Sequence, residues 1–325
     1  MRRTFVGLTL ALAVLGSNLF PAQTAEPIVI KLATVQNEQH AYAIMSYKMK
    51  EDIERLTNGG IILELYHNGA LGDERAILEG MQFGTVGMGI TTSGSAGNFM
   101  PDVTVFEMPF LFDSVEQARK VIDGPVGQNI LSMFENVGFK GLAYAEQGFR
   151  NLTNSRRPVK TVADMAGLKI RVMENELAID LFNALGANAI PMQWGECMTA
   201  LQQKTIDGQE NPLTTIYTFN LHESQKYLTL TRHTYSAAVI LMDMNLWQSL
   251  SADYQKILKD VTADSVAMER KYLDDEDAKY LSGLRERGME ITEPDLASFR
   301  AGIGPITEKY GKRFAGHLGD IAREK

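Results

Sequence analysis

Short stretches of alternating apolar and polar residues recur along the chain, and longer stretches with helical periodicity lie between them. Together with two apolar runs, the alternation predicts strands over residues 28–33, 61–66, 86–91, 139–145 and 235–242. The periodicity predicts helices over residues 40–56 and 73–82, and the Gly- and Ser-rich stretch 92–97 is expected to be a loop. Strands that alternate with helices are typical of an α/β fold.

One uninterrupted helical stretch follows Ser251, a good N-cap residue. From Ala252 to about Arg287 there is no proline, and Gly283 is the only glycine. At ~1.5 Å per residue, a helix of about 30 residues is roughly 45 Å long, which exceeds the diameter of one small domain. We therefore expect this helix to cross two domains, and we expect the tail, residues 294–323, to form further helices on the second domain.

Residues 167–172 place an arginine in a strand-like pattern. Leu168, Ile170 and Val172 alternate with Lys169 and Arg171, so Arg171 should lie on the face opposite the core. A guanidinium near the end of a strand can bind a carboxylate through two parallel charge-assisted hydrogen bonds. It can equally be a surface arginine paired with a neighbouring acid, and this stretch by itself leaves both readings open.

The first 25 residues have the pattern of a secretory signal peptide. Arg2 and Arg3 precede an apolar run from Phe5 to Leu15 that is too short to span a bilayer. We expect cleavage after Ala25, with an uncleaved membrane anchor as the alternative. No later stretch is long and apolar enough to cross a membrane, so the mature protein is expected to be exported and not embedded in a membrane.

Composition and motifs exclude several classes of protein. The chain has 32 Lys and Arg against 40 Asp and Glu, a net charge of −8, and an acidic chain without a basic run is a poor nucleic-acid binder. The five histidines show no metal-ligand spacing, and no nucleophile elbow or dinucleotide fingerprint is present. Cys197, the single cysteine, is expected to be a buried, inert thiol. We predict no metal, no cofactor and no catalytic residue.

Several motifs, taken together in their order along the chain, indicate a protein family more specifically than any single motif does. In chain order they comprise residues 71–75, 107–112, 148–154, 156–159, 164–172, 185–187, 191–196, 200–203 and 206–212. In this order the motifs resemble the solute-binding proteins of TRAP transporters (tripartite ATP-independent periplasmic transporters, the DctP family). The resemblance runs over nearly the whole mature chain.

The resemblance implies a fold and partners. The fold is an α/β, two-lobed periplasmic binding protein with a hinge and one long helix that spans both lobes. We expect residues 26–148 and 237–276 to form the first lobe, and residues 149–236 and 277–325 to form the second. The implied partners are a small organic-acid ligand and the TRAP membrane permease, which is driven by an ion gradient. The protein is expected to be a periplasmic monomer without a cofactor.

The resemblance also assigns roles in the second lobe. Arg171 matches the arginine that binds the ligand carboxylate, and Arg150 matches a second family arginine. Asn211 matches an asparagine whose amide can donate to the same ligand, and Trp194 matches an aromatic residue that covers the ligand's apolar face. Arg150 could instead hold the hinge, Trp194 could belong to the core, and Asn211, which precedes a proline, could serve a turn.

Positions in the first lobe match less closely. Glu74 matches a residue that contacts polyhydroxy ligands in sialic-acid binders, although it also suits the first turn of a helix. Val35 and Thr92 stand where those binders have an asparagine and a glutamate. We therefore expect a smaller acid, such as a dicarboxylate, a 2-oxo or hydroxy acid, or a uronate. Thr92 and His40 are further candidate ligand contacts; each could instead be an ordinary surface residue.

Two other functions are compatible with parts of the pattern. A secreted enzyme could use Arg171 to bind a carboxylated substrate, with an unidentified carboxylate as the base. An ABC-type binding protein would share the two lobes but would lack the long helix and this order of motifs.

Overall fold

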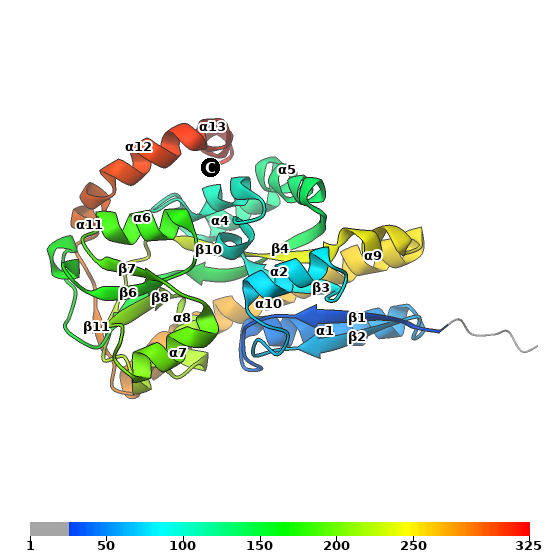
Figure 1. Ribbon diagram of the computed structural model, residues 1–325, viewed down its shortest axis with the longest axis horizontal. Helices are drawn as coiled ribbons and strands as arrows, with labels where there is room; N and C mark the ends of the chain where they lie inside the picture. Colours follow the sequence, from blue (N-terminus) through cyan, green and yellow to red (C-terminus); the bar gives the residue numbers. More distant parts are fainter. Residues whose placement is uncertain (1–25) are drawn as a thin grey trace, which may run out of the picture.

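Two β-sheets organise residues 26–325, the part of the chain that the computed structural model describes (Figure 1). The predicted signal peptide and its cleavage site lie outside these residues. The first sheet contains β1 (Ile28–Ala33), β2 (Ile61–Tyr66), β3 (Met88–Thr92), β4 (Phe139–Phe149) and β10 (Tyr235–Asp243), in the order β2-β1-β3-β10-β4. We call this sheet with its helices the first lobe.

The second sheet has six strands and forms the second lobe. They are β5 (Asn151–Asn154), β6 (Lys169–Val172), β7 (Asn188–Pro191), β8 (Gly208–Asn211), β9 (Tyr227–Thr229) and β11 (Glu290–Thr292), in the order β11-β9-β5-β8-β6-β7. The predicted two-lobed α/β fold is confirmed. The exact lobe boundaries expected from the sequence stay a prediction.

Helices connect and cover the strands of each lobe. In the first lobe they are α1 (Ala41–Leu56), α2 (Glu74–Gln82), α3 (Ser93–Ala96), η1 (Pro101–Glu107), α4 (Val115–Asp123), α5 (Pro125–Met133), η2 (Phe134–Val137) and α9 (Met244–Ser249). In the second lobe they are η3 (Val162–Met165), α6 (Glu176–Ala184), α7 (Trp194–Gln202), α8 (Leu213–Thr218) and η4 (Leu221–Glu223).

The expected loop over residues 92–97 is wrong, because the short helix α3 lies there. Thr92 ends β3 and caps this helix: its Oγ1 accepts a hydrogen bond from the Ser95 backbone N–H at 3.3 Å. The strand expected to end at residue 145 also continues to Phe149. Its last residues pair with the start of β10, where Phe149 faces Tyr235.

Two of the chain's crossings between the lobes lie next to each other and form a hinge. Arg150 is the single residue between β4 and β5, and residues 230–234 join β9 to β10. The two crossings are tied together, because the Arg150 backbone N–H donates to the Thr234 carbonyl at 2.8 Å. Gly148, just before the crossing, has a φ of +98°, a left-handed conformation that glycine adopts at little cost.

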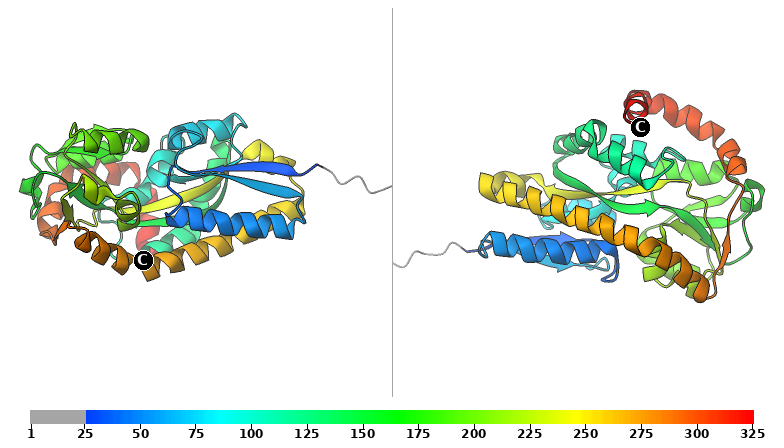
Figure 2. Two further views of the ribbon diagram at one scale, coloured as in Figure 1. Left: turned by 90° about the horizontal axis from the view of Figure 1, so that it is seen from below. Right: turned by 180° about the vertical axis from the view of Figure 1, so that it is seen from behind.

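The helix α10 (Ala252–Glu286) has 35 residues and runs along both lobes (Figure 2). It packs against α1 and β4 of the first lobe and against α8 of the second, which confirms the expected crossing. Gly283 permits the contact with α8, since a Cβ there would lie 2.6 Å from the Tyr217 ring. A side chain at this position would require the Tyr217 ring to move.

The tail consists of α11 (Leu296–Gly302), α12 (Gly304–Arg313) and α13 (Ala315–Glu324). α12 packs against α6 as expected, but α13 packs against α4 and α5 of the first lobe. His317 is hydrogen-bonded to Asp102 at 2.8 Å, and Glu324 accepts from the Val126 N–H at 3.0 Å. The expectation that the whole tail packs on the second lobe is therefore wrong for α13.

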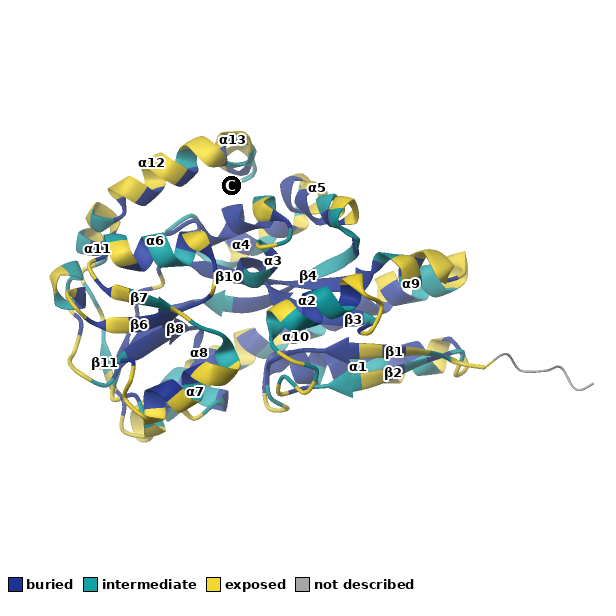
Figure 3. Cartoon of the chain, in the orientation of Figure 1, coloured by how far each residue is buried: buried dark blue, intermediate teal, exposed yellow. Residues whose placement is uncertain are grey.

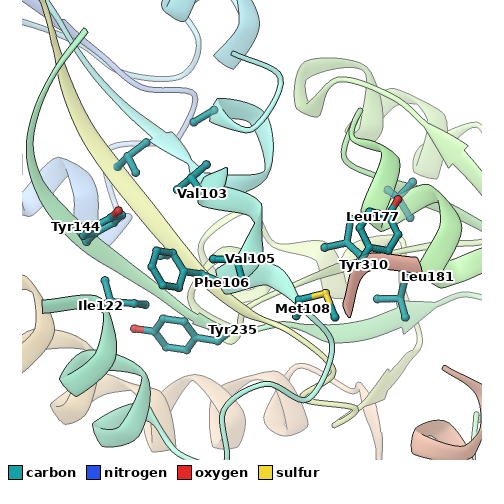
Figure 4. Close-up of a cluster of buried hydrophobic side chains, with 14 of the residues drawn as sticks. Val103, Val105, Phe106, Met108, Ile122, Tyr144, Leu177, Leu181, Tyr235 and Tyr310 are labelled. Carbon is teal, nitrogen blue, oxygen red and sulfur yellow. The ribbon is translucent and has the colours of Figure 1, made fainter. Parts of the chain in front are cut away.

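The core is continuous between the lobes. β10 is buried at every position, and Figure 3 shows the central strands of both sheets buried beneath exposed outer helices. In Figure 4, Met108 lies between Val105 and Phe106 of the first lobe and Leu177 and Leu181 of the second, and all five belong to one cluster of buried apolar residues. Burial of this kind of surface is the main stabilising term in folding. No helix within residues 26–325 is long and apolar enough to cross a membrane.

Candidate functional site

A cavity between the two lobes has about 430 Å³ of space not filled by protein atoms, part of it open to solvent. Its lining comes from both lobes: Asp73, Glu74, Arg75, Ser95 and Asn98 from the first, and Arg171, Met173, Glu174, Met192, Gln193 and Trp194 from the second. We call it the anchor cavity. Three of the residues expected from the sequence, Arg171, Trp194 and Glu74, thus meet in one place.

Arg171 supplies a fixed, buried cation to this cavity. It is 5% exposed, and its Nε donates to the Met192 carbonyl at 2.8 Å. Its guanidinium lies 5.5 Å from the centre of the Trp194 ring. Among residues 26–325 no carboxylate is ion-paired with it, and burial lowers its pKa. A guanidinium stays charged even so, and a buried cation is favourably paired with an incoming anion.

Trp194 forms one wall of the cavity. It is the first residue of α7, and its ring is perpendicular to that of Phe219 with centroids 5.0 Å apart. Its indole Nε1 is buried and has no hydrogen-bond partner within the described part of the chain. The Arg171 guanidinium lies over this ring, which presents an apolar surface to the cation.

Glu74, which lines the cavity from the first lobe, is paired with Thr92. The Thr92 backbone N–H donates to Glu74 Oε1 at 2.8 Å, and the Thr92 hydroxyl donates to Glu74 Oε2 at 2.6 Å. The carboxylate is thereby oriented while it keeps lone pairs for further donors. Glu74 lines the cavity, whereas Thr92 lies behind it, and a direct contact of Thr92 with a ligand stays a prediction.

Arg150 is held by a buried network at the hinge. Its guanidinium donates to both carboxylate oxygens of Glu210, at 2.5 and 2.8 Å, and to Gln147 Oε1 at 3.1 Å. It also donates to Asn211 Oδ1 at 3.2 Å, and Asn211 donates in turn to Gln209 at 2.5 Å. Neither Arg150 nor Asn211 lines the anchor cavity, so ligand contacts by these two residues stay predictions.

The network keeps Glu210 ionised. Burial acts to raise the pKa of this carboxyl, but the Arg150 charge and the hydrogen bond with His233 outweigh it and hold the pKa at about 2. The His233 Nε2 lies 3.2 Å from Glu210. Sequence reasoning missed both residues, although Glu210 lies inside the Gly-Gln-Glu-Asn-Pro motif that carried the resemblance.

Glu107 is a second buried carboxyl beside this network. It accepts from the Ser93 hydroxyl at 2.6 Å and is 4% exposed. Burial raises its pKa to about 7, against the opposing effects of Arg150 and Ser93, and the negative charge of Glu210 adds to the rise. Glu107, Arg150, Glu210 and His233 line a small cavity that adjoins the anchor cavity at Met173.

The raised pKa of Glu107 predicts a pH-dependent stability. Since the folded-state pKa lies above the ordinary value of 4.5, the contribution of Glu107 is complete below pH 4.5 and is lost as the pH rises toward 7. We expect Glu107→Gln to remove this loss, so that the variant gains up to about 3 kcal/mol relative to the native protein at pH 8. Denaturant unfolding of both proteins between pH 5 and pH 8 measures this gain in the free energy of unfolding. A difference between the two proteins that does not change with pH would contradict the raised pKa of Glu107.

His40 caps α1 and joins the two lobes. Its Nδ1 accepts from the Tyr42 N–H at 3.2 Å, and its Nε2 is hydrogen-bonded to the Thr215 hydroxyl of α8 at 3.3 Å. Burial lowers its pKa to about 3, so the ring is neutral. It does not line the anchor cavity, and a contact with the ligand stays a prediction.

Side-chain hydrogen bonds join the two lobes. Asn37 donates to the Thr218 carbonyl at 3.0 Å. Asn98, which lines the anchor cavity, donates to the Glu174 carbonyl at 2.9 Å. The two lobes are therefore in contact with each other beside the cavity. Asn98 and Gln193 also line the cavity, and neither was among the ligand contacts predicted from the sequence.

The described residues offer little for catalysis by a metal or a thiol. No group of three or more His, Cys, Asp or Glu residues within 26–325 could hold a metal ion. Cys197 is buried as expected, and burial raises its pKa to about 11, which leaves the thiol protonated at neutral pH.

Comparison with known proteins identifies the family. Residues 32–313 match the bacterial extracellular solute-binding proteins, family 7 (DctP). The chain belongs to this family. A solute-binding protein of Verminephrobacter eiseniae is 40% identical over 286 residues, covering 88% of this chain and 85% of the relative. The 2,3-diketo-L-gulonate-binding periplasmic protein YiaO of Escherichia coli is 32% identical over 298 residues, covering 91% of each.

A solved structure agrees with the whole fold. The sugar acid binding protein DctPAm from Advenella mimigardefordensis, in complex with galactonate, superimposes with a TM-score of 0.89 at 33% identity. The match covers 92% of this chain and 99% of that one. The protein is thus a TRAP-type solute-binding protein, as the order of its motifs predicted.

Proposed function

We propose that this protein captures a small organic acid in the periplasm and delivers it to the ion-gradient-driven membrane permease of a TRAP transporter. Arg171 is the observation that carries the proposal. Its guanidinium is buried between the lobes, is fixed by the Met192 carbonyl and the Trp194 ring, and has no carboxylate partner among the described residues. A ligand carboxylate supplies the missing partner, and a bidentate pair with it is strong because water is excluded.

Closure of the lobes follows from the same pairing. The ligand contacts walls from both lobes, so it stabilises the closed arrangement over an open one. The lobes would open and close about the hinge at Arg150, and the hydrogen bonds of His40 and Asn98 across the lobes would hold the closed form. The permease would then recognise the closed form.

The relatives support a carboxylate ligand. YiaO is named for binding 2,3-diketo-L-gulonate, and the Advenella protein holds galactonate. We propose reversible binding without turnover, since transport proteins of this kind release their solute unchanged. The competing function is a secreted enzyme that acts on a carboxylated substrate.

A thermal-shift screen of purified protein tests the proposal. The protein is first unfolded and refolded to remove bound ligand, and the panel contains dicarboxylates, oxo acids, aldonates, uronates and amino acids. An acid present at 100 times its dissociation constant should stabilise the protein by about 2.7 kcal/mol, a shift of several degrees. Failure of every organic acid in the panel to raise the melting temperature would contradict the proposal.

A further inference from the structure

We propose that the binding cleft continues past Trp194 into a second compartment, which takes the uncharged, hydroxylated tail of a longer organic acid. A hollow with about 810 Å³ of space not filled by protein atoms, part of it open to solvent, adjoins the anchor cavity. Asp73, Gln193 and Trp194 line both spaces, so the two spaces are neighbours beside these three residues. The inference rests on the proposed function, because the carboxylate at the head of the acid is held by Arg171.

Charge separates the two compartments. The anchor cavity contains the buried cation Arg171, whereas neither lysine nor arginine is among the described residues that line the second compartment. Its charged residues are Asp73 and Glu196. A second carboxylate at the tail would face these two acids without a cation, and such like-charge placement is costly. The tail that fits is therefore uncharged.

Arg75 does not change this conclusion. It lines the anchor cavity, but its Nε is paired with Glu79 at 2.9 Å, and its side chain is 65% exposed. A surface cation that already has a partner contributes little to binding a second anion. The cleft thus provides one strong site for a carboxylate.

The lining also favours hydroxyl groups on an aliphatic chain. Carboxylates accept hydrogen bonds from hydroxyls, and the Gln193 amide can donate or accept. Trp194 and Phe219, which lie perpendicular to each other, present apolar ring surface to the C–H groups between the hydroxyls. A chain with a carboxylate at one end and several hydroxyls beyond it, an aldonate-type acid, matches both compartments.

Filling the second compartment tests the inference. A Cβ at Gly195 would have no heavy atom within 4 Å, and Gly195 lines this compartment, so Gly195→Phe places a ring there without a backbone clash. The control is Gly316→Phe on α13, an exposed glycine whose Cβ would also be unobstructed. Calorimetric titration of each purified protein with galactonate, a six-carbon aldonate, and glycerate, its three-carbon counterpart, gives the affinities.

We expect Gly195→Phe to weaken the binding of galactonate at least 10-fold and to change the affinity for glycerate less than 3-fold. The variant protein should melt within a few degrees of the native protein. Gly316→Phe should change neither affinity. An equal loss of affinity for both acids, or no loss of affinity for galactonate, would overturn the proposal of a second compartment.

Galactarate, which has a carboxylate at each end of the same six-carbon chain, tests the uncharged tail. We expect it to bind the native protein at least 10-fold more weakly than galactonate, and equal or tighter binding would overturn this assignment. If the native protein binds other organic acids but no aldonate, the ligand class is wrong while the proposed function stands. If no organic acid binds at all, the proposed function itself fails.

Discussion

Arg171→Ala is expected to weaken binding of the organic acid at least about 100-fold while leaving the fold intact. The substitution removes both parallel hydrogen bonds to the ligand carboxylate, and the loss of one member of a desolvated charge pair costs about 2–5 kcal/mol. The ligand-free variant should melt at or above the temperature of the native protein. Burial lowers the pKa of Arg171, and no carboxylate among the described residues offsets the cost of its charge.

Arg75→Ala is the matched control for this result. Arg75 lines the same cavity, but its side chain is largely exposed and already paired with Glu79. We expect less than a 3-fold change in affinity. Equal losses in the two variants would mean that general positive charge, and not the held guanidinium of Arg171, binds the ligand. A lower melting temperature for Arg171→Ala would mark the residue as structural.

Arg150→Met should destabilise the folded protein by about 3–5 kcal/mol, because the buried carboxylate of Glu210 then loses its main partner. For a protein of this size, the melting temperature should fall by roughly 10 °C. The double variant Arg150→Met with Glu210→Met should be more stable than Arg150→Met alone, since it leaves no buried charge unpaired. Additive losses would show that the two residues act independently.

The same pair predicts a loss of stability in acid. The folded-state pKa of Glu210, about 2, lies below its ordinary value of 4.5. Its contribution is therefore complete above pH 4.5 and is lost as the pH falls toward 2. Relative to the double variant, the native protein should lose about 3 kcal/mol across this range. Unfolding of both proteins at pH 5, 4 and 3 measures the difference, and parallel pH profiles would contradict the pairing.

Local patterns predicted the elements whose structure depends on nearby residues. The alternation around Arg171 predicted the strand β6, and the proline-free stretch after Ser251 predicted the helix α10. The helix α3 was not predicted, because Gly and Ser usually favour loops; here Thr92 caps the helix and the surrounding core buries it. The return of α13 to the first lobe depends on tertiary contacts such as Glu324 with Val126, 198 positions apart in the chain.

The candidate site was predictable only in part, for the same reason. Arg171 and Trp194 were found through the resemblance, and the structure brings them to one cavity. The pairing of Arg150 with Glu210 joins residues 60 positions apart, and no pattern in the sequence indicates it. Arg150 lies at the hinge and also donates to Asn211, and a ligand contact by Arg150 stays a prediction.

The measurement that tests the account most directly is calorimetric titration of the purified, ligand-free protein with an acid from the thermal-shift screen, followed by chemical analysis of the acid recovered afterwards. We predict binding of one acid per chain, loss of that binding in Arg171→Ala, and complete recovery of the acid unchanged. Consumption of the acid during incubation, or binding that persists in Arg171→Ala, would contradict reversible capture by this guanidinium.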